Sequence, residues 1–141
     1  MIGDTNAIIR AYLADSTACP NIYATVGTRI YCPRLPEKAV LPALAFFTRG
    51  GSANPHIPGM PSPSIQYDCW GNSMIDARGV YRALYNDFQS IQNISVTVGV
   101  ITYYIKSVIE EVQGQDMQDM DYPNYHRVIA FFSVMIQAIV D

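Results

Sequence analysis

The alternation of apolar and polar residues predicts two helices and at least four strands. Apolar residues recur every three or four positions within 4–14, and again after Ser73, as in helices that bury one side. Asp4 or Thr5 is the expected cap of the first helix, and Asn72 or Ser73 that of the second. Asp87 lies mostly away from the apolar stripe of the second helix, which comprises Met74, Ala77, Tyr81, Leu84 and Phe88. Runs rich in β-branched and aromatic residues at 43–48, 64–70, 97–112 and 125–140 predict strands. The third run suits either one long bent strand, with a bulge at Gly99, or two short strands. Within 22–31, Gly27 predicts a turn followed by a short strand.

These elements follow the order helix, strand, strand, helix, strand, strand. That order predicts an α+β fold with a mixed, mostly antiparallel sheet and two helices packed on one face. The length of 141 residues suits a single domain spanning residues 1–141.

A segment rich in proline and glycine separates the strands predicted at 43–48 and 64–70. Residues 49–63 hold three glycines and four prolines, and so long a loop within a compact domain is often functional. We therefore expect a hairpin arm at 50–63 that contacts a partner. The candidate contact residues are Gly50, Gly51, Asn54, His56 and Met60.

The last predicted strand is apolar on both faces, which one small sheet with helices on one face cannot bury. Its side chains are candidates for packing and for contacts between subunits: Phe131, Phe132, Met135 and Ile139. Tyrosine is also abundant, with ten copies, and it is favoured at interfaces because it combines apolar area with a hydroxyl.

Composition narrows the functional classes. Hydrophobic residues make up 50% of the chain, charged residues only 15%, and the net charge is -3. The low charge excludes a disordered tail protein, and nine scattered Lys and Arg residues give no basic face for nucleic acid. The N-terminus lacks a secretory pattern, and the apolar stretch at 128–140 is too short for a membrane helix, so no membrane partner is expected.

Motifs for chemistry are sparse. The P-loop and dinucleotide-binding patterns are absent, and three cysteines without a C-x-x-C pair predict free thiols. Cys69 or His126, with Asp68, is the alternative enzymatic site, but consecutive strand residues point to opposite faces. We therefore predict no enzyme activity, cofactor or metal site.

Acidic side chains cluster between the last two predicted strands, at Asp116, Asp119 and Asp121. The spacing lacks the glycine that a calcium loop needs, so a solvated acidic loop is the simpler interpretation. The functional alternative is a negatively charged rim that repels DNA or binds a basic partner.

Four segments in order resemble the tail-completion or tail-terminator family of long-tailed phages. They are VGTRIY at 26–31, LPAL at 41–44, QYDCWG at 66–71 and YPNYHR at 122–127. The arm is richer in proline, and the last strand more apolar, than is usual in that family.

The resemblance implies a virion protein that is made in the host cytoplasm and forms a hexameric ring on the tail tube. Its implied partners are other copies of itself, the tail tube protein and the head connector or stopper, and DNA passes through without specific binding. The acidic cluster then becomes a candidate for the lumen or rim. The alternatives are another neck component, such as a head-side stopper or head-completion protein, and a small cytoplasmic enzyme.

Overall fold

The computed structural model describes residues 4–32, 34–35, 40–52, 62–89, 94–118 and 125–138. Within these residues the three helices are α1 (Thr5–Leu13), α2 (Pro20–Val26) and α3 (Met74–Gln89). The six strands in the same part of the chain are β1 (Ile30–Tyr31), β2 (Ala43–Ser52), β3 (Ser62–Gly71), β4 (Ile94–Val98), β5 (Ile101–Gln118) and β6 (His126–Ala138).

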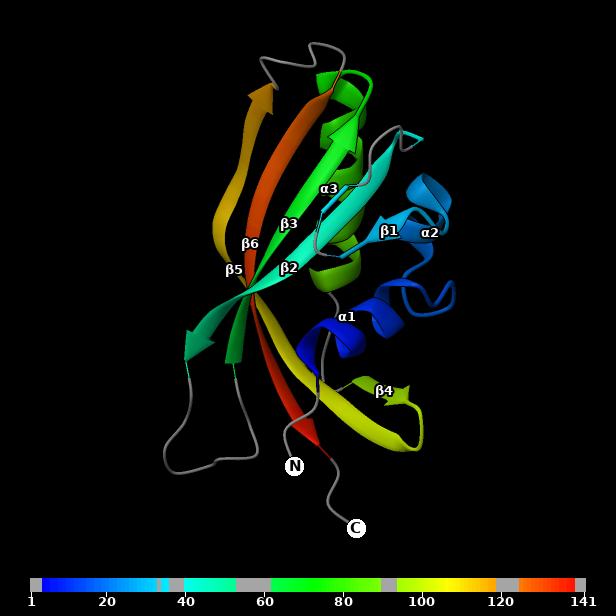
Figure 1. Ribbon diagram of the computed structural model, residues 1–141, viewed down its shortest axis with the longest axis vertical. Coiled ribbons are helices and arrows are strands. Elements are labelled where there is room, and N and C mark those ends of the chain that lie inside the picture. The colour runs from blue at the N-terminus through cyan, green and yellow to red at the C-terminus, as the bar shows by residue number, and fades with distance from the viewer. Residues whose placement is uncertain are drawn as a thin grey trace.

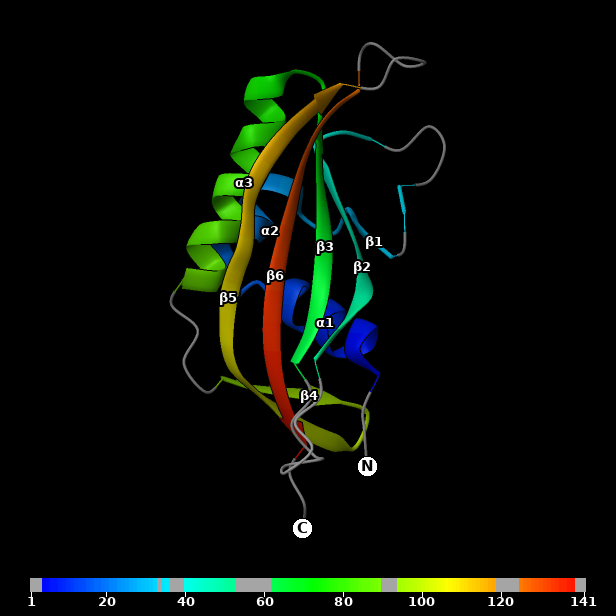
Figure 2. The same cartoon turned by 90° about the vertical axis from the view of Figure 1, so that its left-hand side faces the viewer.

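The strands form one mixed sheet in the order β1-β2-β3-β6-β5-β4. Only β1 and β2 pair in parallel, and every other neighbouring pair is antiparallel. The predicted α+β fold with a mostly antiparallel sheet is therefore confirmed. Figure 1 shows α3 behind the long strands, with α2 near β1 and α1 near β4, and Figure 2 shows α3 along one face of the sheet.

The core lies between the helices and this face of the sheet. Its aromatic centre joins α1 and α3 to two central strands: Tyr12 stacks on Phe88, and Tyr67 meets Phe88 and Phe132 edge to face at 5.3 and 5.5 Å. Edge-to-face packing suits the charge distribution of the rings and adds to the stabilisation from apolar burial. All four rings are at most 3% exposed.

Local sequence explains the two predicted helices. The Asp4 carboxylate accepts the Asn6 backbone N–H at 3.1 Å and caps α1, while the Ser73 hydroxyl accepts the Asp76 N–H at 3.2 Å and caps α3. Each cap satisfies a backbone donor that the first helical turn leaves unpaired. Gly71, which precedes α3, is required for packing, because a Cβ there would lie 2.5 Å from the Ala77 nitrogen.

A third helix, α2, was not predicted, because the signal that starts it lies elsewhere in the chain. The side chain of its N-cap residue, Cys19, forms no capping hydrogen bond. Instead the Asp87 carboxylate, from α3, accepts the backbone N–H groups of Asn21 and Ile22 at 3.4 and 2.8 Å and the Asn21 side chain at 2.9 Å. The sequence pattern had placed Asp87 mostly away from the core, and this was wrong, since Asp87 is only 4% exposed.

Several boundaries also differ from the prediction. β2 and β3 extend to Ser52 and from Ser62, so both ends of the expected arm belong to the sheet. β5 extends to Gln118 into the segment predicted to be a loop. Gly99 is not a bulge but a turn residue between β4 and β5, with φ of +64°.

Candidate assembly surface

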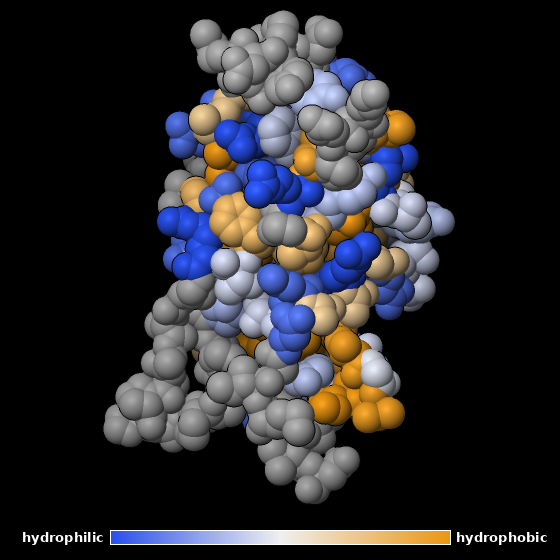
Figure 3. Space-filling view, viewed as in Figure 1, coloured by the Kyte–Doolittle hydropathy of each residue, from blue (hydrophilic) through white to orange (hydrophobic). Residues whose placement is uncertain are grey.

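The second face of the sheet is not covered by any helix in the described part of the chain. Along a strand, side chains alternate between faces, so the neighbours of each core residue point to this open face. One row across it is Phe47, Gln66 and Phe131, which are aligned by the strand register. Ile129 and Met135 of β6 lie on the same face, and the four apolar members of this group are all half-buried. Figure 3 shows the face, with apolar side chains among polar ones over the long strands.

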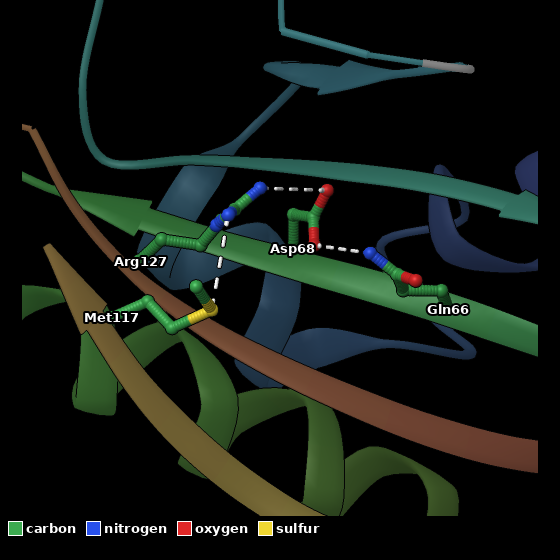
Figure 4. Close-up of polar contacts among 4 residues, drawn as sticks. All are labelled: Gln66, Asp68, Met117 and Arg127. Atoms are coloured by element: carbon green, nitrogen blue, oxygen red, sulfur yellow. Dashed lines mark hydrogen bonds and ion pairs between the residues drawn. The ribbon is translucent and has the colours of Figure 1, made fainter. Parts of the chain in front are cut away.

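A buried carboxylate lies on this open face. Asp68 is 6% exposed and accepts a hydrogen bond from the Gln66 amide at 3.0 Å. Its second oxygen lies 3.9 Å from the Arg127 guanidinium, which also donates to the Met117 sulfur at 3.8 Å (Figure 4). Burial raises the pKa of Asp68, and the Gln66 hydrogen bond and the Arg127 charge only partly offset this.

Aromatic rings extend the Arg127 contact. The guanidinium lies 5.1 Å from the centre of the Trp70 ring, and Tyr125 meets Trp70 edge to face at 6.2 Å. Arg49 sits in the same way over Phe131, at 4.5 Å. A guanidinium over an aromatic ring is attracted by the electron-rich face of the ring. The open face therefore carries aromatic and arginine side chains in contact with one another, and both residue types are enriched in protein interfaces.

The structure separates Asp68 from Cys69, two residues that the enzymatic alternative would bring together. Asp68 points to the open face, whereas Cys69 is fully buried on the helical face. Burial raises the pKa of the Cys69 thiol and keeps it neutral, which makes it a poor nucleophile. Within the residues that the structure describes, no group of three or more His, Cys, Asp or Glu side chains could hold a metal ion.

The four candidate interface residues of β6 separate into different places. Phe131 and Met135 lie on the open face, half-buried. Phe132 is 2% exposed and packs on Tyr67 and Phe88 in the core of its own chain. Ile139 lies outside the described residues. A contact between subunits stays a prediction for Phe131 and Met135.

The arm and the acidic cluster are described only in part. Gly50 and Gly51 belong to β2, beside a shift in its register with β3, whereas Asn54, His56 and Met60 lie outside the described residues. Asp116 is on β5 and forms an ion pair with Arg78 at 2.7 Å. Asp119 and Asp121 also lie outside the described residues.

A groove along the seam between α3 and β5 was missed by sequence reasoning. Its first hollow, of about 260 Å³, is lined by Arg78, Tyr81, Arg82, Tyr85 and Glu110. The second, of about 170 Å³, shares Tyr85 and Glu110 and adds Phe88, Gln89, Val108 and Phe132. We call the two hollows together the seam groove. The sequence carries one signal that could have indicated this groove. The two arginines are four residues apart, as are the two tyrosines, and this spacing puts each pair on one side of a helix.

Hydrogen bonds fix one wall of the seam groove. The Tyr81 hydroxyl donates to Glu110 at 2.5 Å, and Arg78 donates to the Gly114 carbonyl at 3.2 Å. Burial and the Glu110 hydrogen bond raise the pKa of Tyr81. Gly114 allows this close approach, because a Cβ there would lie 2.9 Å from the Tyr81 ring. These bonds hold Arg78 and Tyr81 in the wall of the first hollow, and Tyr85 lines both hollows.

Comparison with known proteins gives a likeness of fold. No protein-family model matches the chain, and no curated protein matches it. Among solved structures, a chain from the virion of a native gene transfer agent particle has a similar fold, with a TM-score of 0.54. The match covers 94% of this chain and 92% of that chain, at 10% sequence identity. At this identity the likeness establishes a shared fold. No helix among the described residues is both long and apolar enough to cross a membrane.

Proposed function

We propose that this protein is a structural component of a virion that forms a hexameric ring on the end of a tail tube. The ring stops growth of the tube, joins the tail to the head connector and leaves a channel for DNA. The observation that carries the proposal is the shared fold with a chain of a gene transfer agent virion, over almost the full length of both chains. The resemblance of four ordered sequence segments to tail-terminator proteins selects this role among virion roles.

The open face of the sheet supports assembly. Helices cover one face and bury its apolar side chains almost completely. The opposite face keeps Phe47, Ile129, Phe131 and Met135 half-buried, although a sheet face meant for water is normally polar. A neighbouring subunit would bury these side chains and gain the associated hydrophobic stabilisation.

The net charge of the chain is compatible with a ring through which DNA passes. Six copies with a net charge of -3 each would carry about -18, which disfavours adhesion of the phosphate backbone. Asp116, on the β5 strand that leads to the acidic cluster, is exposed and paired with Arg78, so the repulsion of DNA would rest mainly on Asp119 and Asp121. In this proposal the acidic cluster lines the lumen or the rim.

Loss of the protein from the producing genome tests the role by electron microscopy. A tail terminator is expected to leave filled heads separate from tails, and the tails should vary in length and exceed the normal length. Tails of uniform normal length beside heads that lose their DNA would contradict this role and favour a head-side stopper.

Deletion of residues 52–62 tests the arm separately. We expect a folded protein that no longer joins tails. Normal infectious particles assembled from the deleted protein would contradict a role for the arm in docking.

A further inference from the structure

The seam groove offers hydrogen-bond donors that the chain itself does not use. No described residue accepts a hydrogen bond from the Tyr85 hydroxyl or pairs with Arg82, although both side chains line the groove and are exposed. Around these donors the lining is aromatic: the Tyr81 and Tyr85 rings lie 6.4 Å apart, and Phe88 lines the second hollow. Aromatic grooves with free donors are the usual binding sites for proline-rich segments, whose backbone carbonyls remain unpaired.

The arm is a segment of that type, and it has more prolines at the required spacing than the pair at Pro33 and Pro36. Prolines occur at a spacing of three residues in the arm, at Pro55, Pro58 and Pro61. A polyproline II helix has three residues per turn, so these prolines would share one ridge. Residues 50–63 contain no Asp, Glu, Lys or Arg, so binding would not bury an unpaired charge from the arm.

The dimensions of the two partners agree. Prolines three residues apart on a polyproline II helix are separated by about 9 Å. The residues of α3 that line the two hollows are centred about five to six positions apart, which corresponds to about 8 Å along the helix axis. Two successive prolines therefore fit the two hollows, one on each side of Tyr85.

We propose that the seam groove binds the proline ridge at residues 55–61 of the arm of a neighbouring copy. This inference rests on the proposed ring and names the contact that closes it. The strands that carry the arm end below α3 in Figure 1, at Ser52 and Ser62, so the arm leaves the sheet from β2 and β3 and not from the seam between α3 and β5. The second hollow lies toward this end of the sheet, because Phe132 in its lining pairs with Ile65 of β3, so the chain's own arm is the alternative occupant that the mixing experiment tests. Arg82 and Tyr85 donate to the arm's carbonyls, and the prolines occupy the hollows.

Peptide binding tests the groove directly. The receptor is the full chain with Pro55→Ala, Pro58→Ala and Pro61→Ala, so that no arm of the receptor competes for the groove. The probe is a synthetic peptide of residues 52–64. Titration followed by NMR should shift the amide signals of α3 around Tyr85. Adding Tyr85→Ala should weaken binding by about tenfold or more, whereas Tyr85→Phe, which keeps the ring, should weaken it less. Absence of binding, or binding unchanged by Tyr85→Ala, would overturn the proposal.

A mixing experiment tests whether the occupant is a neighbouring copy. The proline-substituted chain keeps its groove and the Tyr85→Ala chain keeps its arm, so a mixture can form one contact but cannot close a ring. Native mass spectrometry should find a 1:1 heterodimer only in the mixture. Peptide binding without a heterodimer would overturn the neighbouring-copy assignment and indicate that the arm folds onto its own groove.

The failure of this contact differs from failure of the ring itself. If both variants form the same rings as the native chain, the contact proposed here is wrong and the ring proposal stands. If the native protein forms no ring on particles, the proposed function is wrong, whatever the peptide binds.

Discussion

Replacing Asp87 by alanine tests how two helices are joined. The Asp87 carboxylate is 4% exposed and receives three hydrogen bonds from the first turn of α2. Alanine would leave the backbone N–H groups of Asn21 and Ile22 without their acceptor, and it would remove a negative charge from the N-terminus of α2.

The expected loss in the free energy of unfolding follows from these hydrogen bonds. Hydrogen bonds to a charged group contribute about 1.5–3 kcal/mol each, and loss of a cap about 1 kcal/mol, but the three bonds share one carboxylate and do not add fully. We expect Asp87→Ala to lower the free energy of unfolding by about 3 kcal/mol and the Tm by about 10 °C. Asp87→Asn keeps the shape and one acceptor oxygen, so its effect should be smaller.

Urea denaturation followed by circular dichroism measures the effect. The matched control is Asp76→Ala, which removes the same residue type from an exposed position in the first turn of the same helix. The control should lose less than about 1 kcal/mol, since only its interaction with the helix dipole is removed. An equal loss in both variants would refute the role of Asp87 in capping α2.

Three further predictions concern packing, pH and thiol reactivity. Gly114→Ala should lower the free energy of unfolding by about 1–3 kcal/mol, because the new Cβ would lie 2.8 Å from a Val128 methyl. The control Gly79→Ala, in a helix and with open space around it, should raise the free energy of unfolding by about 0.5–1 kcal/mol, and urea denaturation measures both. Burial raises the pKa of Asp68 in the folded state, so the stability of the native chain should fall as pH rises from the ordinary carboxyl pKa through the raised one. Asp68→Asn should lack this fall, and equal pH profiles of the two chains would contradict the prediction. Of the three thiols only Cys32 is partly exposed, so Ellman's reagent should modify one thiol per native chain, and fast modification of two or three would contradict the packing.

The sequence predicted those elements whose signals are local. The caps at Asp4 and Ser73 and the apolar periodicity that follows them located α1 and α3 to within a few residues. Alternation located the strands. α2 could not be found in this way, because seven residues with a proline at the start carry little periodicity and their cap comes from Asp87, about 65 positions later in the chain.

The candidate surface was predictable only in outline. The two-sided apolar pattern of the last strand correctly indicated that one set of side chains faces the core and another faces away from it. Which set is which depends on the side of the sheet that the helices cover, and alternation alone does not specify this. For the same reason the sequence pattern put Tyr81 in the core stripe of α3, whereas the ring lies half-buried at the seam with β5.

The position of these surfaces bears on the kind of assembly that the chain can form. The seam groove lies between α3 and β5, and the arm leaves the sheet from β2 and β3, so the proposed contact would join two different surfaces of the chain. Contacts between different surfaces are head-to-tail, and they produce either a closed ring or an open filament. A contact of the open face with itself would instead give a two-fold dimer, which terminates without enclosing a channel. A closed ring therefore requires a head-to-tail contact, which the proposed contact between groove and arm would supply. In that arrangement the open face would meet the sides of adjacent subunits or the tube below.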